Sequence, residues 1–93
     1  MVVMTCQVQL YLSESRSLKD KRQVVKSLKE RIRGRFNVSV AEVEYHDLWQ
    51  RSTLALAVVS TAGGHANEVL DQVVRFIGQD RRVQLLDYAI EAL

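Results

Sequence analysis

SLKDKRQVVKSLKERIRG, residues 17–34, is the stretch that decides the fold, because it is the clearest helix of the chain. Ser17 followed by Asp20 is typical of a capped helix start, since the hydroxyl accepts a hydrogen bond from an amide of the first turn and the carboxylate favours the positive helix end. Gly34 is expected to end the helix in the left-handed conformation. Plotted at about 100° per residue, one stripe is apolar and predicts a helix lying on a core. Its members are Leu18, Val25, Leu28 and Ile32, with Val24 at the margin.

A second row of side chains on this helix is basic. Its members recur at intervals of three and four residues, so they line up in one sector and form what we call the cationic ridge: Lys19, Arg22, Lys26, Lys29 and Arg33. Residues 16–35 contain nine basic residues against Asp20 and Glu30, a net charge of +7, whereas the whole chain carries +2 and the remainder −5. The positive charge is therefore expected on one face of the molecule.

Length and composition predict one ordered domain, residues 1–93, with one core. The chain is 47% apolar, with no proline and four glycines, which favours order over disorder. Cys6 is the single cysteine and lies in an apolar run, so we expect a buried, reduced thiol and neither a disulfide nor a cysteine metal cluster. The N-terminal run is too short and too polar for a signal or membrane segment. We expect a soluble, cytoplasmic protein with no membrane contact and no cofactor.

The remaining elements follow from the apolar periodicity. Residues 2–12 alternate as in a half-buried strand, and residues 51–61 read as a central strand. The parity of residues 38–45 slips, which predicts a β-bulge or sharp twist near Ala41. A second helical stripe runs from residue 66 and ends near Gly78, after the Ala62-Gly63-Gly64 break. The last strand is predicted over residues 82–92.

The order βαββαβ predicts an α+β, ferredoxin-like fold, a four-stranded antiparallel sheet with two helices on one face. The other sheet face would carry Thr5, Gln7, Gln9 and Tyr11 from the first strand. From the third strand it would carry either Thr53, Ala55, Ala57 and Val59 or Leu54, Leu56 and Val58. Either set makes a smooth surface that another chain or molecule could cover.

Three blocks of residues carry a family resemblance: 17–22 (SLKDKR), 37–43 (NVSVAEV) and 47–51 (DLWQR). Over nearly the whole chain the sequence resembles the YlxP-type family of small bacterial proteins of unknown function. The resemblance implies a ferredoxin-like fold and a context among translation and ribosome-maturation genes, with no established activity. Tyr45-His46 departs from the His-Gln pair more common in the family.

The cationic ridge suits nucleic acid, because several Lys and Arg on one helix face can release counterions from phosphates together. The alternative is an ordinary solvated helix face. Lys21 is a separate case, since it falls within the apolar stripe. We expect its stem to cover the core and its ammonium to reach a carboxylate such as Glu42 or Glu44.

The loop Asp47-Leu48-Trp49-Gln50-Arg51 places the only tryptophan at a turn. An exposed indole there would stack on a base or anchor a protein partner, whereas a folded-back indole would cover the sheet edge. Arg51 would either join the basic surface or pair with Asp47.

The other polar residues predict no chemistry. Gly63-Gly64-His65 lacks the Lys-Ser/Thr of a P-loop and is read as ordinary turn chemistry before the second helix. His46 and His65 lie on separate loops with no third ligand, so no metal site is expected. Glu42, Glu44 and Asp47 have no evident pocket, and an enzyme or ligand binder built on either loop is the third hypothesis.

The first two hypotheses come from different functional classes. The first is a non-enzymatic factor that contacts ribosomal RNA or a ribosomal subunit through the cationic ridge, with Trp49 and Arg51 as a second contact. Base stacking on the sheet face is not expected, because the third strand has no aromatic residue. The second is a protein-interaction or homo-oligomeric module that associates through the open sheet face or a strand edge.

Overall fold

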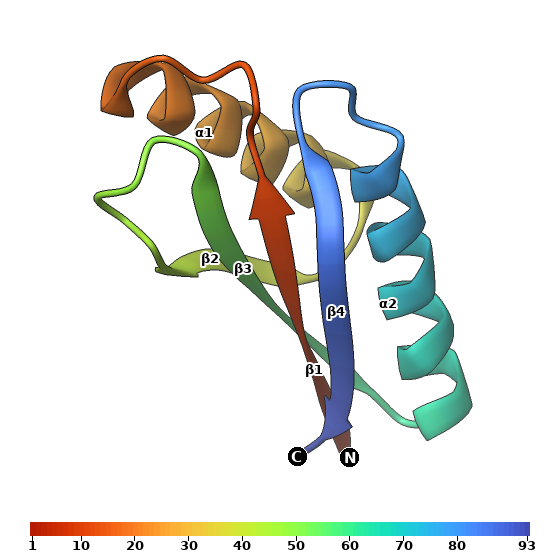
Figure 1. The fold of residues 1–93 in the computed structure, drawn as a ribbon. Coiled ribbons are helices and arrows are strands. Elements are labelled where there is room, and N and C mark those ends of the chain that lie inside the picture. Colours follow the sequence, from red (N-terminus) through yellow and green to blue (C-terminus); the bar gives the residue numbers. More distant parts are fainter.

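The computed structural model describes residues 1–93 and shows six elements in the predicted order. They are β1 (Val2–Tyr11), α1 (Leu18–Arg35), β2 (Ser39–Glu44), β3 (Arg51–Ser60), α2 (Gly63–Gly78) and β4 (Gln84–Ala92). The strands form one antiparallel sheet in the order β2-β3-β1-β4, with both helices on one side of it (Figure 1). This confirms the ferredoxin-like α+β fold. The two termini lie side by side, where the Leu93 amide donates to the Val3 carbonyl at 2.9 Å.

The core lies between the sheet and the helices. In β1, Cys6, Val8 and Leu10 are buried, and Cys6 and Val8 pair with Leu56 and Leu54 of β3. Because paired residues of antiparallel strands share a face, the leucines of β3 point toward the helices. The open face therefore carries the first of the two sets left open by the sequence, Thr53, Ala55, Ala57 and Val59.

Helix α1 begins as predicted and ends differently. The Ser17 hydroxyl accepts a hydrogen bond from the Asp20 amide at 3.0 Å, and the Asp20 carboxylate accepts one from the Arg16 amide at 3.1 Å. The left-handed stop at Gly34 is wrong, because the helix continues to Arg35 and no glycine has a positive φ. The chain leaves the helix at Phe36 in an extended conformation, φ −129°, which places the Phe36 ring edge-on to Phe76 of α2 at 5.6 Å. The contact between Phe36 and Phe76 thus accompanies the point at which the chain leaves α1.

Strand β2 contains the predicted irregularity, two residues later than expected. Its register against β3 shifts between Glu42 and Glu44, so the bulge lies at Val43 and not near Ala41. Glu42, opposite Leu54, faces the helices, while Glu44, opposite Thr53, is on the open face. Tyr45 follows with a φ of 64°, the only positive φ outside glycine, and turns the chain into the hairpin loop.

The other element boundaries also shift. Helix α2 starts at Gly63, so Gly63, Gly64 and His65 form its first turn and do not precede it as expected. Strand β4 starts at Gln84, two residues after the predicted start, because Asp80 holds the preceding turn through the Arg82 amide at 2.9 Å. Neither helix is long and apolar enough to cross a membrane.

The outer strand β2 is covered by side chains. Arg33 Nη2 of α1 donates to the Val40 carbonyl at 2.9 Å, and His46 Nε2 lies 3.1 Å from the Glu42 carbonyl. These carbonyls are two residues apart and therefore project from the same side of the strand. Two acceptors of an edge strand are thus occupied by the protein itself.

Candidate functional site

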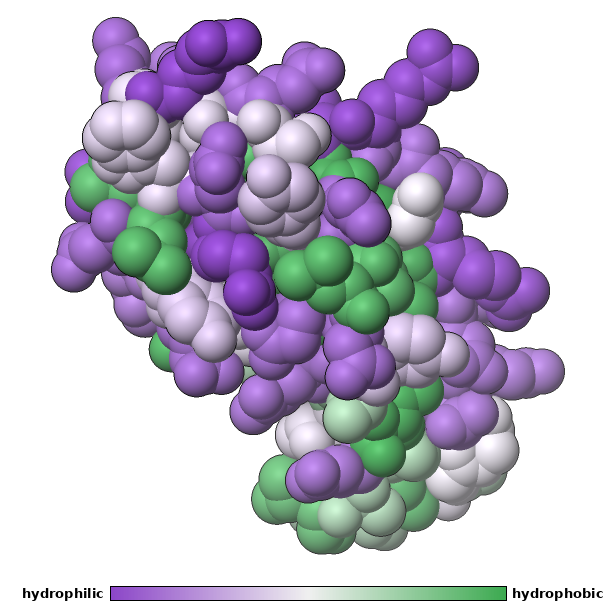
Figure 2. All heavy atoms as spheres, viewed as in Figure 1, coloured by the Kyte–Doolittle hydropathy of each residue, from purple (hydrophilic) through white to green (hydrophobic).

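The cationic ridge is assembled along the flank of α1 that faces β2. Lys19, Arg22 and Lys26 are exposed and Lys29 is half-buried, while Arg33 is exposed and reaches the Val40 carbonyl. No ridge residue takes part in an ion pair, since the three pairs of the molecule are Lys21–Glu42, Arg31–Asp80 and Arg82–Asp80. Hydrophilic residues dominate the upper rim in Figure 2, where α1 lies in Figure 1. The ridge is therefore a row of cations without carboxylate partners.

Two of the nine cations of residues 16–35 belong to the fold instead. Lys21 is neutralised by Glu42, and Arg31 lies 3.2 Å from Asp80 and 5.1 Å from the centre of the Phe76 ring. Seven cations of the segment remain without a carboxylate partner: Arg16, Lys19, Arg22, Lys26, Lys29, Arg33 and Arg35.

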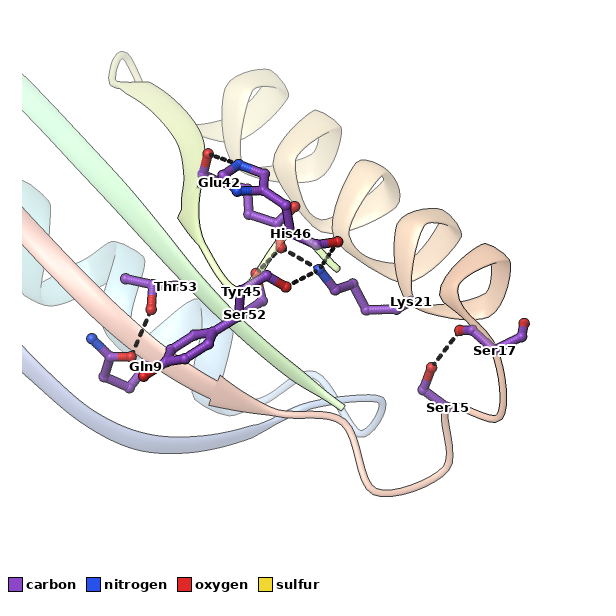
Figure 3. Close-up of polar contacts among 9 residues, drawn as sticks. All are labelled: Gln9, Ser15, Ser17, Lys21, Glu42, Tyr45, His46, Ser52 and Thr53. Carbon is purple, nitrogen blue, oxygen red and sulfur yellow. Dashed lines mark hydrogen bonds and ion pairs between the residues drawn. The ribbon is translucent and has the colours of Figure 1, made fainter. Parts of the chain in front are cut away.

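Lys21 joins α1 to the hairpin, as Figure 3 shows. Its side chain is fully buried, and Nζ donates to Glu42 Oε2 at 2.6 Å and to the carbonyls of Tyr45 at 2.9 Å and His46 at 3.2 Å. All three ammonium protons therefore have acceptors. Ser52 donates to the same Glu42 oxygen at 2.7 Å. The predicted structural role of Lys21 is confirmed, with Glu42 as the partner because the bulge turns Glu44 to the other face.

The hairpin loop is held at both ends. Lys21 holds Tyr45 and His46, and at the other end the Gln50 carbonyl accepts from the Leu12 amide at 2.9 Å. The Gln50 side chain donates to the carbonyls of Ser13 at 3.2 Å and Ser15 at 3.3 Å. The loop is thereby tied to the segment that leads into α1.

Trp49 is 55% exposed, which answers the question that the sequence left open. It lines two shallow depressions. One is formed by residues 47–51 of the loop itself, and the other is shared with Ser13, Ser15, Arg16 and Gln50. The indole therefore stands between the hairpin loop and the start of α1.

Arg51 does not pair with Asp47. Its guanidinium carbon lies 4.8 Å from the centre of the Tyr45 ring, a cation–π arrangement. Arg51 Nε is buried and is the only buried side-chain nitrogen or oxygen in the molecule without a hydrogen-bond partner. Most buried polar groups in proteins are paired, so this donor is an exception, and Arg51 is also one of the residues that line the depression beside Trp49.

The start of α2, the histidines and Cys6 form no joint site. The N-cap of α2 is Ala62, which makes no side-chain cap, and no three His, Cys, Asp or Glu residues lie close enough together to hold a metal ion. Cys6 is buried, as predicted, and desolvation raises the pKa of its thiol to about 11.

One polar cluster was not anticipated from the sequence. Arg82 donates to both oxygens of the Asp80 carboxylate, through Nε at 3.0 Å and Nη2 at 2.7 Å, and to the Ser27 hydroxyl of α1 at 3.0 Å. These hydrogen bonds lower the pKa of Asp80 and raise that of Arg82. The cluster fixes the loop between α2 and β4 against α1. The available signal was the Asp-Arg-Arg order at residues 80–82, which does not reveal the distant partner Ser27.

Two comparisons with known proteins cover most of the chain. A family model described as "Protein of unknown function (DUF503)" matches residues 3–90, a span that contains both the cationic ridge and the hairpin loop. The "Uncharacterized protein YlxP" of Bacillus subtilis (strain 168) is 38% identical over 72 residues, which cover 77% of this chain and 76% of that protein.

Proposed function

The chain belongs to the DUF503 family of proteins of unknown function. From the charges on its surface, we propose that it is a non-enzymatic RNA-contacting factor. In this proposal the cationic ridge binds phosphates of a structured RNA, with ribosomal RNA or a ribosomal subunit as the partner.

The observation that supports this function is that no cation of the ridge is held in an ion pair. Lys19 and Arg33 are fourteen positions apart, which is about 21 Å at the rise of an α-helix. A row of this length meets several phosphates of one strand at once. Because none of its members is in an ion pair, each keeps an uncompensated charge that can displace a counterion from RNA, and Arg33 keeps donors beyond the one that bonds the Val40 carbonyl.

The arrangement favours recognition of backbone and shape. The major groove of A-form RNA is deep and narrow, so a helix flank meets phosphates and the 2′-hydroxyls of the shallow minor groove. Lysines and arginines that contact phosphates position a protein without reading sequence. We therefore expect strong binding to structured RNA with little sequence preference.

The test is an RNA-binding titration at several salt concentrations. Five phosphate contacts would give a slope of about −3.5 to −4.5 in a plot of log affinity against log salt. Arg22→Glu/Lys26→Glu removes two exposed ridge cations, and Arg75→Glu/Arg81→Glu makes the same charge change at exposed positions off the ridge. We expect the first variant to flatten the slope by about 2 and weaken binding, whereas the second keeps the slope of the parent.

Two results would contradict the proposal. One is a wild-type protein that does not bind structured RNA or ribosomal subunits at low salt. The other is an equal loss of affinity in both double variants, since that would make net charge and not the ridge the determinant.

A further inference from the structure

We propose that the hairpin loop binds an unpaired RNA base, with Trp49 as the stacking platform, at the end of the backbone held by the cationic ridge. The inference rests on the proposed function and adds to it the class of RNA, a duplex that borders a single-stranded segment.

The indole of Trp49 stands on a loop that is anchored at both ends. Large exposed aromatic side chains are costly to leave in water and are used for contact with partners. Trp49 is 55% exposed on a loop that is tied by Lys21 at one end and by Gln50 at the other. Because the loop is already ordered, binding would not have to order it, and the interaction energy is retained as affinity.

The depression beside Trp49 adjoins the start of the cationic ridge. Arg16 and Trp49 line the same depression, and Arg16 precedes the first ridge residue, Lys19, by three positions. Three residues of chain reach at most about 11 Å. A strand that follows the ridge toward the start of α1 would therefore arrive at the indole.

The depression formed by residues 47–51 differs from the ridge in its chemistry. The Asp47 carboxylate would repel a phosphate, so this end of the surface does not continue the phosphate row. A base edge carries both donors and acceptors, and carboxylates accept from exocyclic amines. Arg51 lines the same depression, and a guanidinium donates hydrogen bonds to acceptors such as those of a base edge. Together with the apolar faces of Leu48 and Trp49, these groups fit a base better than a phosphate.

The experiment uses the fluorescence of Trp49, the only tryptophan of the chain. The two probes are a blunt RNA duplex of about 16 base pairs, the length a duplex-binding domain covers, and the same duplex with a short single-stranded overhang. Since stacking of one base on an aromatic side chain corresponds to a change of about 5- to 150-fold, we expect the overhang RNA to bind tighter by that factor and to quench the indole.

Three variants separate stacking from other effects, and because two of them lack the tryptophan, their binding is followed by the anisotropy of fluorescently labelled RNA. Trp49→Leu should lose the preference for the overhang while keeping both duplex binding and the salt slope, and Trp49→Phe should retain most of the preference. Tyr88→Leu removes another exposed aromatic ring, 44% exposed on β4, and should behave like the parent.

The outcomes distinguish the two proposals. If both RNAs bind with equal affinity and the fluorescence does not change, the loop does not receive a base, while the ridge proposal stands. If Trp49→Leu weakens both RNAs equally, the loop contributes to general binding or to folding and the stacking inference is wrong. If neither RNA binds the parent protein at low salt, the proposed function itself fails.

Discussion

Replacing Lys21 with methionine keeps the long apolar stem and removes the ammonium that joins α1 to the hairpin. Breaking a buried ion pair from one side costs about 3–5 kcal/mol, because the remaining charge stays desolvated. The Glu42 side chain stays 13% exposed and keeps its hydrogen bond from the Ser52 hydroxyl, and both lower the cost of the lost ion pair. The carbonyls of Tyr45 and His46 also lose a charged donor, and this raises the cost. We expect a loss of about 3 kcal/mol in the free energy of unfolding.

A loss of this size is large for a domain of 93 residues, since such domains have about 5–15 kcal/mol in total. Each kcal/mol lowers Tm by about 4–8 °C at this chain length, so Lys21→Met should melt at least about 12 °C lower. Urea unfolding followed by far-UV circular dichroism measures the change directly. Lys26→Met is the matched control on the same helix, because Lys26 is exposed and unpaired, and its effect should stay within about 0.5 kcal/mol.

A double variant tests the cause of the loss. Lys21→Met/Glu42→Leu removes both charges, so it should be more stable than Lys21→Met alone, although the loop carbonyls still lack a donor. The reasoning is refuted if Lys21→Met changes the free energy of unfolding by less than about 1 kcal/mol. It is refuted equally if Lys26→Met costs as much, since helix propensity or overall charge would then explain the effect.

Three further expectations concern other parts of the fold. The pKa of Asp80 is lower in the folded chain than its ordinary 3.8, so the stability that Asp80 contributes is complete above that pH and is lost as the pH falls through the folded pKa. In thermal melts, Asp80→Asn should cost about 1.5–3 kcal/mol at pH 7. The difference from the parent should shrink below about pH 4. With a pKa of about 11 against an ordinary 9.0, the Cys6 thiol should react with a maleimide at pH 7.5 at least about 100-fold more slowly in the native protein than in urea. Ser17→Ala removes the cap of α1 and should cost about 1 kcal/mol in urea unfolding, whereas Ser13→Ala, at an exposed residue outside the helix, should cost little.

Periodicity carried the prediction of the fold, because it depends on local spacing. The stripe of α1 correctly predicted that Val25, Leu28 and Ile32 are buried, whereas Leu18 is only half-buried. Lys21 is buried as well, and its place inside the apolar row had indicated a carboxylate partner. The element order then restricted the topology to one arrangement. The register between β2 and β3 could not be predicted from the sequence. A change of parity indicates that a bulge exists, but only the pairing with β3 shows that it lies at Val43.

The features that sequence did not predict depend on distant contacts. Gly34 could have ended α1, but the contact of Phe36 with Phe76 on α2 decided the exit, and nothing local announces it. The exposure of Trp49 follows from how Gln50 and Lys21 tie the loop, through partners far away in the chain. The cationic ridge, in contrast, was visible in full, because a row of side chains on one helix is a local property.

The covered edge of β2 limits how copies of this chain can share a sheet. With Arg33 and His46 on its carbonyls, a further strand has no free row of acceptors to extend on that side. On the opposite edge, β4, no side chain lies on a carbonyl, although the Tyr88 amide donates to Asp87 Oδ1 at 2.8 Å. Addition of a strand is therefore favoured at β4, and pairing of β4 with β4 about a two-fold axis would close at two molecules, whereas growth into a fibre would also need the covered edge of β2.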